Sequence, residues 1–302
     1  MGGLLVYFKN LLKQNHFSYC LIRKIKEVYI GLFSEKTWIE RSWHKKFNQN
    51  LSFKNVNTYN EKIQWLKVYG KRDQISINCA DKLKVRDYVK AAIGKEYLNE
   101  LIGVYASIKD IHADSLPLKY VLKTTHDSGS VLIKKSSKSL DINELKKIEC
   151  SLSSNYSIIS KEWVYGDIKP QLIIEKFLES DNGKSLKDYK VFCFDGEPKL
   201  IQVDLDRFEE HKRNFYNTDW EKLDLEIEYP SDDINVQRPN LLNKMLELSK
   251  ALSGPFIHAR IDWYISNNKL VFGEITFFHG GGFEKFSSKK WENILGNWIK
   301  LD

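Results

Sequence analysis

A pair of strand-like segments near the end of the chain limits the possible folds more than any other feature. Residues 256–278, FIHARIDWYISNNKLVFGEITFF, alternate like two β-strands joined by a short asparagine-rich turn. Because successive strand residues face opposite sides, Arg260 and Asp262 share one face of the first strand. Glu274 and Thr276 share one face of the second strand. The segment therefore predicts an antiparallel hairpin with a charged side.

The length of the turn decides which of these side chains meet. A connection with an odd number of residues sets Asp262 opposite Glu274, and Arg260 opposite Thr276. A two-residue turn at positions 267–268 instead sets the two carboxylates on opposite faces. The sequence leaves both registers open.

Two carboxylates at directly opposed strand positions repel each other, since their Cβ atoms lie about 5 Å apart. Placing Asp262 opposite Glu274 therefore favours a cation between them. Hard oxygen ligands suit Mg²⁺, whose shell is completed by water and substrate phosphates. The alternative is the solvent-facing polar side of an edge hairpin, and other segments have to decide between the two.

Length and charge narrow the class of partner. The chain has 302 residues, of which 42% are hydrophobic, enough for more than one lobe. Lysine and arginine outnumber aspartate and glutamate by 47 to 40, which gives a formal charge of +7 spread along the chain. Duplex nucleic acid requires a concentrated basic stripe, so this distribution favours anionic small molecules and no nucleic-acid partner.

The four cysteines at positions 20, 79, 150 and 193 are far apart and lack the spacing of a zinc site or a disulfide framework. We therefore expect unpaired thiols in a reducing compartment. No stretch reaches about 18 uninterrupted apolar residues, and the N-terminus lacks the regions of a signal peptide. These features predict a cytoplasmic protein.

The first 30 residues mix bulky apolar side chains with five lysines and arginines. A basic amphipathic helix of this kind can lie on a membrane surface, which would place the protein at the inner face of the membrane. It can equally pack its apolar stripe on the body of the protein. Both interpretations stay open.

Further along, helical periodicity dominates up to about residue 118 and short β runs follow. Helices are predicted at 57–70, 79–94, 141–153 and 239–254, and strands at 119–124, 131–134, 171–178, 188–195, 198–204, 257–265 and 270–277. The pattern predicts an α+β chain with two β-containing lobes behind a helical front end.

Two lysines on predicted strands are further candidate ligand-binding residues. Lys123 ends an apolar strand just before the small, flexible loop 125–130 (THDSGS). Backbone N–H groups of such a loop can point at one anion, and a lysine adds a positive charge. The loop lacks the order of a Walker motif, and an ordinary turn is the alternative. Lys190, in DYKVFCFDGEP, faces either a ligand or, at an edge, water.

These segments occur in one order: lysine strand, small loop, IIEKFL, DYKVFCFDGEP, RID and GEITFF. The order resembles that of ATP-grasp enzymes. NEKIQWLKVYG, ADKLKVRDYV, IQVDLDRFEEHKRNFY and GGGFEKF make the chain similar to the TupA-like ATP-grasp family from about Asn57 to the C-terminus. The resemblance implies an ATP-grasp fold with four parts: a helical extension (1–55), a helical pre-grasp region (56–118), a small lobe (119–179) and a catalytic lobe (180–302).

The resemblance also assigns residues to ligands. The positions that match ATP-binding ones are Lys123, His126, Ser128, Gly129, Ser130, Glu175, Lys176, Phe177, Leu178 and Lys190. Asp262 and Glu274 match the acidic pair that binds Mg²⁺, and Arg260 matches the arginine that meets the transferred phosphoryl group. Thr276 stands where the family commonly has asparagine, so a second metal ion is less expected than the first.

The activity implied is that of an ATP-dependent carboxylate–amine ligase acting through an acyl phosphate, in surface-polysaccharide biosynthesis. Its carboxylate would be a hexuronic acid in a nucleotide- or lipid-linked saccharide, and its amine an amino acid or small amine. A cation cluster and flexible backbone suit an anionic sugar, which gives the candidate substrate residues Arg207, His211, Arg213, Thr276, Gly280, Gly281 and Gly282. A solvated charged loop is the alternative for the cations.

Two rival functions remain. Asp204 and Asp206 form a DxD motif like those that hold metal and nucleotide sugar in glycosyltransferases, although no opening parallel βαβ unit accompanies it. A non-catalytic nucleotide-binding scaffold of a polysaccharide complex is the third possibility. The presence of both lysines and both carboxylates argues against a scaffold.

Overall fold

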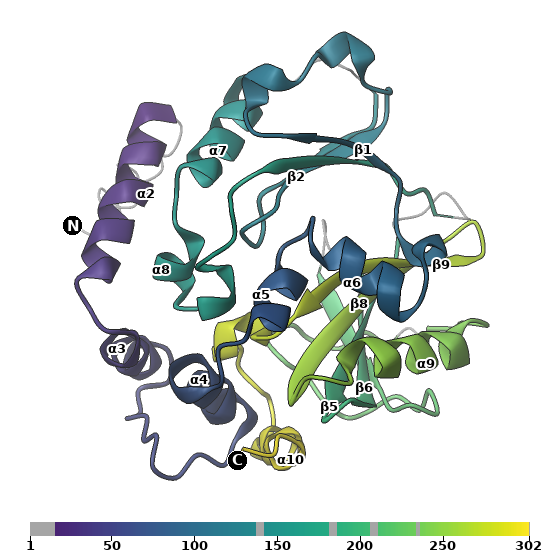
Figure 1. Ribbon diagram of the computed structural model, residues 1–302. Helices are drawn as coiled ribbons and strands as arrows, with labels where there is room; N and C mark the ends of the chain where they lie inside the picture. Colours follow the sequence, from purple (N-terminus) through teal and green to yellow (C-terminus); the bar gives the residue numbers. More distant parts are fainter. Residues whose placement is uncertain (1–15, 137–141, 181–185, 206–210, 234–235, 302) are drawn as a thin grey trace. The chain divides into compact units, whose positions relative to one another are not determined.

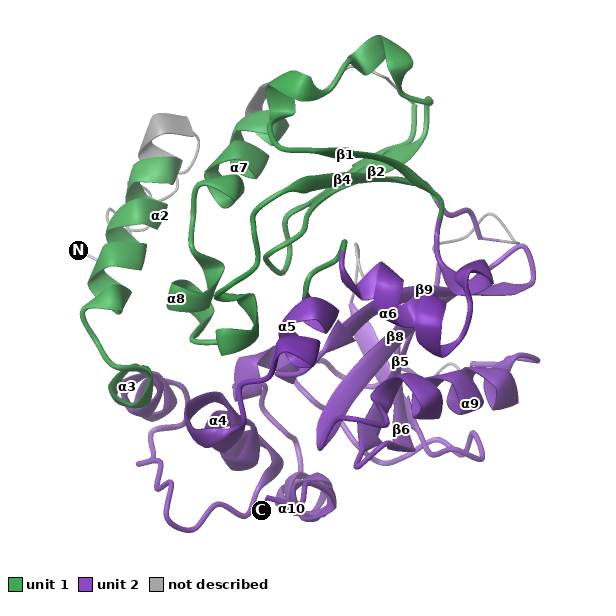
Figure 2. Cartoon of the chain, in the orientation of Figure 1, with its two compact units in different colours: residues 1–38, 81–83, 100–177 green, residues 39–80, 84–99, 178–302 purple. Residues whose placement is uncertain are grey.

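The computed structural model describes residues 16–136, 142–180, 186–205, 211–233 and 236–301. The chain divides into two compact units (Figure 2). Unit 1 comprises the residues up to Trp38, Asp81–Leu83 and Glu100–Phe177, and unit 2 comprises Ile39–Ala80, Lys84–Asn99 and Leu178–Asp302. Each unit contains one antiparallel sheet, which confirms the α+β class (Figure 1).

Unit 1 is built on a four-stranded sheet in the order β1-β4-β2-β3. Its strands are β1 (Leu101–Tyr105), β2 (Tyr120–Thr124), β3 (Val131–Lys134) and β4 (Leu172–Lys176). Leu122, Leu172 and Ile174 lie on one face and pack with Ile148 in an apolar core. The helices of this unit are α2 (His16–Gly31), α7 (Ile142–Leu152) and α8 (Tyr156–Ser160), with short 3₁₀ turns η2 (Ile108–Asp110), η3 (Ala113–Ser115) and η4 (Trp163–Tyr165).

Unit 2 is built on a five-stranded sheet in the order β7-β6-β5-β8-β9. Its strands are β5 (Asp188–Phe194), β6 (Glu197–Leu205), β7 (Lys212–Tyr216), β8 (His258–Ser266) and β9 (Lys269–Thr276). Helix α9 (Leu242–Ser253) covers one face, where Trp263 Nε1 donates to Ser249 Oγ at 2.8 Å. The further elements are α4 (Tyr59–Tyr69), α5 (Gln74–Ala80), α6 (Val85–Ala92), η1 (Lys95–Tyr97), η5 (His279–Gly282) and α10 (Lys289–Trp298), while α3 (Glu35–Phe47) begins before the unit boundary.

Local sequence explains the helix boundaries. Helix α4 starts with a capping box, in which Glu61 N donates to Thr58 Oγ1 and Thr58 N donates to Glu61 Oε2. The single helix expected at 79–94 is wrong, because α5 ends at Ala80 and α6 begins only after a turn. Asp81 Oδ1 accepts a hydrogen bond from Leu83 N at 2.8 Å, and this side chain-to-backbone bond competes with helix continuation.

The hairpin of β8 and β9 combines features of both registers considered above. Its turn has two residues, Asn267 and Asn268, with φ values of 51° and 53°, as a type I′ turn requires. Arg260 nevertheless pairs with Thr276, because a β-bulge shifts the register between Ile261 and Trp263. The expectation that a two-residue turn separates the faces is therefore wrong, since one extra residue in β9 restores the charged side.

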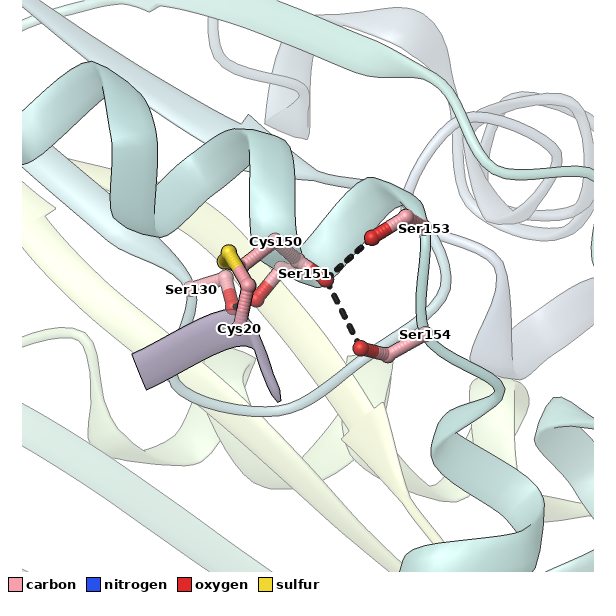
Figure 3. Close-up of a disulfide and its surroundings, with 6 residues drawn as sticks. All are labelled: Cys20, Ser130, Cys150, Ser151, Ser153 and Ser154. Atoms are coloured by element: carbon pink, nitrogen blue, oxygen red, sulfur yellow. Dashed lines mark hydrogen bonds between the residues drawn. A yellow bond between two sulfur atoms is a disulfide. The ribbon is translucent and has the colours of Figure 1, made fainter. Parts of the chain in front are cut away.

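The structure also corrects the expectation for the cysteines. Cys20 on α2 forms a disulfide with Cys150 on α7, with their Cα atoms 5.4 Å apart (Figure 3). The two residues are separated by 130 positions, so only the packing of α2 along α7 brings them together. Cys79 and Cys193 are buried free thiols, as expected. None of the described helices is long and apolar enough to cross a membrane.

Candidate active site

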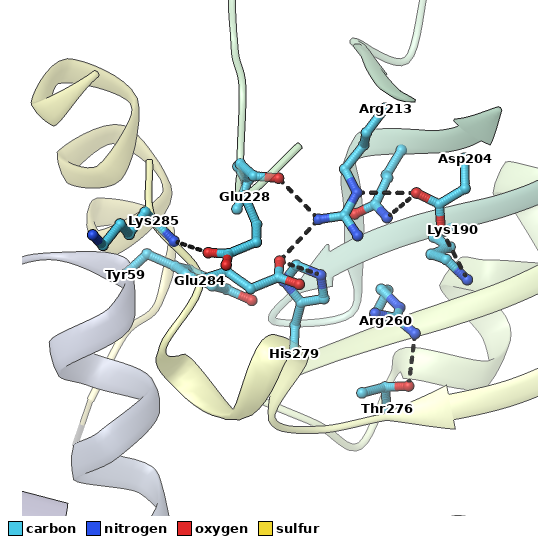
Figure 4. A network of polar contacts seen from close by, with 12 residues as sticks. Tyr59, Lys190, Asp204, Arg213, Glu228, Arg260, Thr276, His279, Glu284 and Lys285 are labelled. Carbon is cyan, nitrogen blue, oxygen red and sulfur yellow. Dashed lines mark hydrogen bonds and ion pairs between the residues drawn. The ribbon is translucent and has the colours of Figure 1, made fainter. Parts of the chain in front are cut away.

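The face of the unit 2 sheet opposite α9 is lined with charged side chains from every strand. Figure 4 shows Lys190, Asp204, Arg213 and Arg260 among them. Cross-strand pairing accounts for this, because directly opposed residues share a face. On β5, Asp188 lies opposite Asp204 of β6, and Lys190 lies opposite Asp262 of β8. Arg213 of β7 lies opposite Asp204. The register of five strands therefore gathers these groups on one surface.

Lys190 is the central cation of this surface. Its Nζ bonds to Asp188 Oδ2 and lies 3.0 Å from Asp262 Oδ2 and 3.7 Å from Asp204 Oδ2. Burial alone would lower the pKa of Lys190, but Asp262 and Asp188 outweigh it and raise that pKa above its usual value. Burial raises the pKa of Asp188 despite the opposing effect of Lys190. Lys190 is thus a buried, charged ammonium group and does not face water.

Arg260 holds Asp262 with a two-pronged interaction. Its Nε donates to Asp262 Oδ1 and its Nη2 to Asp262 Oδ2, each at 2.7 Å. The same Nη2 donates to Thr276 Oγ1 at 3.1 Å and lies 3.5 Å from Glu274 Oε1. Burial lowers the pKa of Arg260, and the carboxylate of Asp262 more than restores it, so the net direction is upward. The two pairs of side chains, each of which alternation placed on one face of its own strand, therefore meet.

Glu274 differs from the other carboxylates in its exposure. Its side chain is 44% exposed, compared with 3% for Asp262, and its Oε1 accepts from Thr276 Oγ1 at 3.3 Å. The carboxylate of Glu274 thus does not lie in the hydrophobic core, although the residues next to it in β9 are apolar.

The donor chemistry of this corner fits Mg²⁺. Two carboxylates and a hydroxyl supply hard oxygen ligands on one face, and Glu274 is accessible. Both oxygens of Asp262 are bound by Arg260 and Lys190, so this carboxylate would have to exchange one of these partners for a metal ion. The described residues contain no group of three or more His, Cys, Asp or Glu side chains placed as a protein-only metal site. The set therefore suits an ion that shares its ligands with phosphate and water.

A second network extends from Asp204. Arg213 Nε donates to Asp204 Oδ1 at 3.0 Å, and its Nη1 donates to Glu284 Oε2 at 2.9 Å (Figure 4). Burial would raise the pKa of Asp204, but Arg213 and Lys190 lower it to about 2. His279 Nε2 lies 3.2 Å from Glu284 Oε2, and burial together with Arg260 and Arg213 holds the pKa of His279 well below its usual value.

This network includes residues predicted to bind substrate. Arg213 donates from Nε to Asp204 and from Nη1 to Glu284 and Ile227 O, and it lies on β7, a strand that the sequence did not predict. His211 lies beside Asp204, with 3.3 Å between His211 Nε2 and Asp204 Oδ1, and its ring is 3.9 Å from that of Tyr229. Arg207 lies outside the described residues, as does the second aspartate of the DxD motif at position 206.

The three glycines form the 3₁₀ turn η5 with φ values of 56°, 61° and 69°. The carbonyl oxygens of Gly281 and Gly282 accept from Gln64 Nε2 at 2.9 and 2.8 Å, and Lys67 Nζ donates to Gly281 O at 2.8 Å. A Cβ on Gly282 would lie 2.6 Å from Gln64 Nε2 and 2.8 Å from Ile63 Cγ2. The close approach in the structure is therefore to helix α4, a contact that the sequence did not indicate.

In unit 1, Lys123 and the loop that follows β2 have different environments. Lys123 Nζ pairs with Glu175 Oε2 of β4 at 2.7 Å on the half-buried face of the sheet. Within the loop, His126 is buried and its Nε2 contacts Ser151 O at 3.0 Å, while Ser128 and Gly129 are exposed. Burial lowers the pKa of His126. The tip of the loop, rather than His126, is thus accessible to a ligand in this unit.

Asp127 organises this loop and was missed in the sequence. Its carboxylate accepts from Thr124 Oγ1 and Ser130 Oγ, and lies 3.8 Å from Arg23 Nη2. Its carbonyl oxygen accepts from Lys82 Nζ. The aspartate and serine residues of the segment indicated a local turn, but nothing in the sequence indicated the contacts of Asp127 with distant residues.

The segment expected to bind adenine follows β4. Lys176 N donates to Glu100 O at 3.0 Å, and the Lys176 side chain forms an exposed ion pair with Glu100. Lys135 Nζ lies 5.6 Å from the centre of the Phe177 ring. Leu178 is half-buried and begins the next part of unit 2. The roles of these residues toward a nucleotide stay predictions.

The fold and the two lysine–carboxylate sites define an α+β protein with the charged groups that phosphate and magnesium chemistry requires. The family model described as TupA-like ATPgrasp matches residues 61–300. The chain therefore belongs to the TupA-like ATP-grasp family, and its fold is the ATP-grasp fold.

Comparison with solved structures found D-alanine–D-alanine ligases and an ATP-grasp ligase. The D-alanine–D-alanine ligase from Bacillus anthracis is 16% identical with a TM-score of 0.40, over 70% of this chain and 59% of that chain. The corresponding Helicobacter pylori ligase is 16% identical with a TM-score of 0.40, over 80% and 69%. The ATP-grasp ligase PsnB complexed with minimal precursor is 8% identical with a TM-score of 0.39, over 72% and 59%. A search of curated proteins gave no match.

Proposed function

We propose that the protein is an ATP-dependent carboxylate–amine ligase. Membership of the TupA-like ATP-grasp family supports this proposal. The observation that carries it is the convergence of Lys190 and Arg260 on Asp262, beside Thr276 and the accessible Glu274. Phosphoryl transfer asks a protein mainly for charge neutralisation and in-line positioning, and this corner has the groups for both.

In the proposed reaction, a carboxylate oxygen of the substrate attacks the γ-phosphorus of ATP, and the bond to the β–γ bridging oxygen breaks. ADP leaves and an acyl phosphate remains. An amine then attacks the acyl carbon, loses a proton and displaces inorganic phosphate, which gives an amide. Lys190 and Arg260 would neutralise phosphate charge, and both are held in the charged form by the neighbouring carboxylates.

Mg²⁺ bound with ATP would supply charge neutralisation at the phosphate oxygens. Asp262 and Glu274 are the residues proposed to hold it, with Thr276 Oγ1 as a neutral neighbour. In unit 1, Lys123 and the exposed loop tip at Ser128 and Gly129 are proposed to contribute to phosphate binding.

The proposed substrates are a hexuronic acid within a nucleotide- or lipid-linked saccharide and an amino acid or small amine, in surface-polysaccharide biosynthesis. This assignment follows from the family resemblance. Since Arg213 is held by Asp204 and Glu284, we propose that it positions these carboxylates and that any direct contact with a sugar comes from other groups. The glycosyltransferase alternative would need Asp204 to exchange its partner Arg213 for a metal ion, and the UDP-sugar arm of the test below decides it.

The test begins with thermal shift measurements of the full chain with ATP and Mg²⁺, and separately with UDP-sugars. Phosphate release is then measured with mixtures of uronic acids and amines, and each product is identified by mass. Stabilisation by ATP and amine-dependent phosphate release support the ligase. Stabilisation by UDP-sugar alone would indicate the transferase, and ATP binding without phosphate release under any mixture would indicate the scaffold.

A further inference from the structure

Helix α2 has two faces of opposite character. The face toward unit 1 carries Cys20, tied to α7 by the disulfide, and Arg23, which lies near the carboxylate of the β2–β3 loop. Glu27 is 7% exposed and Ile30 is fully buried on the same side. Lys161 follows the last residue of α8, and its Nζ donates to the carbonyl oxygen of Ile30 at 3.2 Å. The inward face of the helix is therefore fully used within the unit.

The other face is apolar and open to solvent. Its members are five large side chains of α2 and Leu32, which directly follows the helix. Their exposed fractions are Leu21 48%, Ile22 40%, Ile25 58%, Val28 61%, Tyr29 52% and Leu32 75%. With 3.6 residues per turn, they fall within an arc of about 120° on the side of the helix away from Ile30. We call these six residues the apolar stripe. Among the described residues, six of the thirteen exposed large hydrophobic side chains lie in this one stripe, so exposed apolar surface is concentrated there.

Positive charge flanks the apolar stripe on both sides. Lys24 and Lys26 lie about 40° beyond its two edges on the helix circumference. The side chain of Lys24 is 55% exposed, although its ammonium group also contacts Glu27 at 3.1 Å, and Lys26 is exposed. Along the sequence, residues 1–26 contain five lysines and arginines and no aspartate or glutamate. The surroundings of the stripe therefore complement an anionic surface.

We propose that the apolar stripe docks on the surface of an anionic lipid bilayer, with α2 lying in the plane of the interface. Aliphatic side chains would enter the boundary between headgroups and acyl chains, while the flanking lysines reach the headgroups. The disulfide and the buried contacts of Glu27 and Ile30 hold the helix so that this face points outward. This proposal concerns location and is independent of the ligase reaction.

Sedimentation with vesicles tests the proposal on the full chain. One set of vesicles contains phosphatidylcholine alone, and the other also contains about one third phosphatidylglycerol, which provides the negative surface. The wild type is expected to bind the anionic vesicles about tenfold more strongly, and roughly 0.5 M salt is expected to remove most of this difference. The variant Lys24→Gln/Lys26→Gln is expected to lose the preference for anionic vesicles.

The matched comparison separates the stripe from general surface hydrophobicity. Ile25→Ser/Val28→Ser/Leu32→Ser is expected to reduce vesicle binding about tenfold. Val104→Ser/Leu118→Ser/Val131→Ser alters three side chains of the same unit that are 38%, 58% and 43% exposed, and is expected to bind like the wild type. Both variants should retain the circular dichroism spectrum and the cooperative thermal unfolding of the wild type, which shows that they are folded.

Three results would overturn the proposal. The first is the absence of binding to anionic vesicles by the wild type. The second is an equal loss of binding in both triple variants. The third is a dimer in sedimentation equilibrium that disappears in the α2 triple variant while vesicle binding is absent, because the stripe would then be an interface between copies of this chain.

Discussion

Lys190 Nζ lies 3.0 Å from Asp262 Oδ2, directly across the central strands β5 and β8. Both side chains are almost fully buried, and Arg260 holds the same carboxylate from the other side. The groups proposed to meet phosphate are thus already ordered before a nucleotide arrives. An incoming phosphate would replace a carboxylate as the partner of these cations, so little side-chain ordering would remain to be done on binding.

Lys190→Met should lower the free energy of unfolding by about 3–5 kcal/mol, because it leaves buried carboxylates without their central cation. Lys176→Met is the control, since that lysine forms an exposed ion pair with Glu100 and should cost less than about 1 kcal/mol. Chemical denaturation monitored by circular dichroism measures both. Equal effects of the two substitutions would contradict the buried network around Lys190.

Glu274→Gln should leave the stability within about 0.5 kcal/mol of the wild type, since the side chain is 44% exposed. It should remove most of the increase in ATP affinity that Mg²⁺ produces, because the proposed metal corner loses its accessible carboxylate. Calorimetric titration of ATP with and without Mg²⁺ gives this difference without relying on turnover. Glu100→Gln, another exposed glutamate, should preserve it, and an unchanged Mg²⁺ effect in Glu274→Gln would exclude the glutamate as a ligand.

The stability of unit 2 should fall as the pH is lowered from 6.5 to about 4. Burial lowers the pKa of His258 from 6.5 to about 4. In the buried site, His258 Nδ1 contacts Cys193 O and His258 Nε2 contacts Tyr59 Oη, each at 2.9 Å. The unfolded chain therefore takes up a proton in this range before the folded chain does. The contribution of His258 is present above pH 6.5, and about 3 kcal/mol of it is lost by pH 4.

Denaturant titrations across this pH range check the sign and size of the effect. His258→Gln should flatten the dependence on pH, although it also lowers stability at neutral pH. His112→Gln, at an exposed position, should keep the slope of the wild type. A wild-type stability that is constant or rises on acidification in this range would contradict the prediction.

Gly282→Ala should destabilise the protein by roughly 2–4 kcal/mol. The backbone at this position has φ of 69°, and the added Cβ would meet Gln64 and Ile63 at less than 3 Å. Gly129 in unit 1 has φ of 94°, but a Cβ there would meet no atom within 4 Å. Gly129→Ala should therefore lower the free energy of unfolding by only about 1 kcal/mol, the cost of the backbone conformation. Equal free energies of unfolding for Gly282→Ala and Gly129→Ala would contradict the close contact between η5 and α4.

The disulfide makes a direct chemical prediction. The denatured, unreduced protein should titrate as two free thiols, from Cys79 and Cys193, and as four after reduction. Cys150→Ser should lower the stability of unit 1 by up to about 4 kcal/mol, because it releases a long closed loop. Four free thiols before reduction would contradict the pairing of Cys20 with Cys150.

Strand alternation predicted the part of the site that depends on nearest neighbours in sequence. It placed Arg260 with Asp262 on one face of β8, and Glu274 with Thr276 on one face of β9. The structure brings these four together. It did not find the bulge, because both alternatives for the turn assumed an uninterrupted ladder. The geometry of a hairpin is thus more predictable from its side-chain pattern than from the length of its turn.

The rest of the site depends on contacts between distant strands. Asp188 stands two residues before Lys190 and so had to share its face, which was a readable signal. Glu284 and His279 could not be placed in the same way, because both lie after the last strand of the sheet. Glu284 contacts Arg213, and His279 contacts Glu284. The pairing of Cys20 with Cys150 likewise depends on packing between helices.

The bulge in β9 has a consequence for how this hairpin can change in length. Gly273 and Glu274 together stand opposite Asp262 in the bulge, and a Cβ on Gly273 would lie 3.0 Å from Asp262 O and 3.3 Å from Asp262 Cβ. Deleting Gly273 would leave a regular ladder in which the two-residue turn alone sets Arg260 opposite Thr276. Replacing it with a larger residue would instead push on the strand that carries Asp262. At this position the hairpin should accept a shorter chain more readily than a bulkier one.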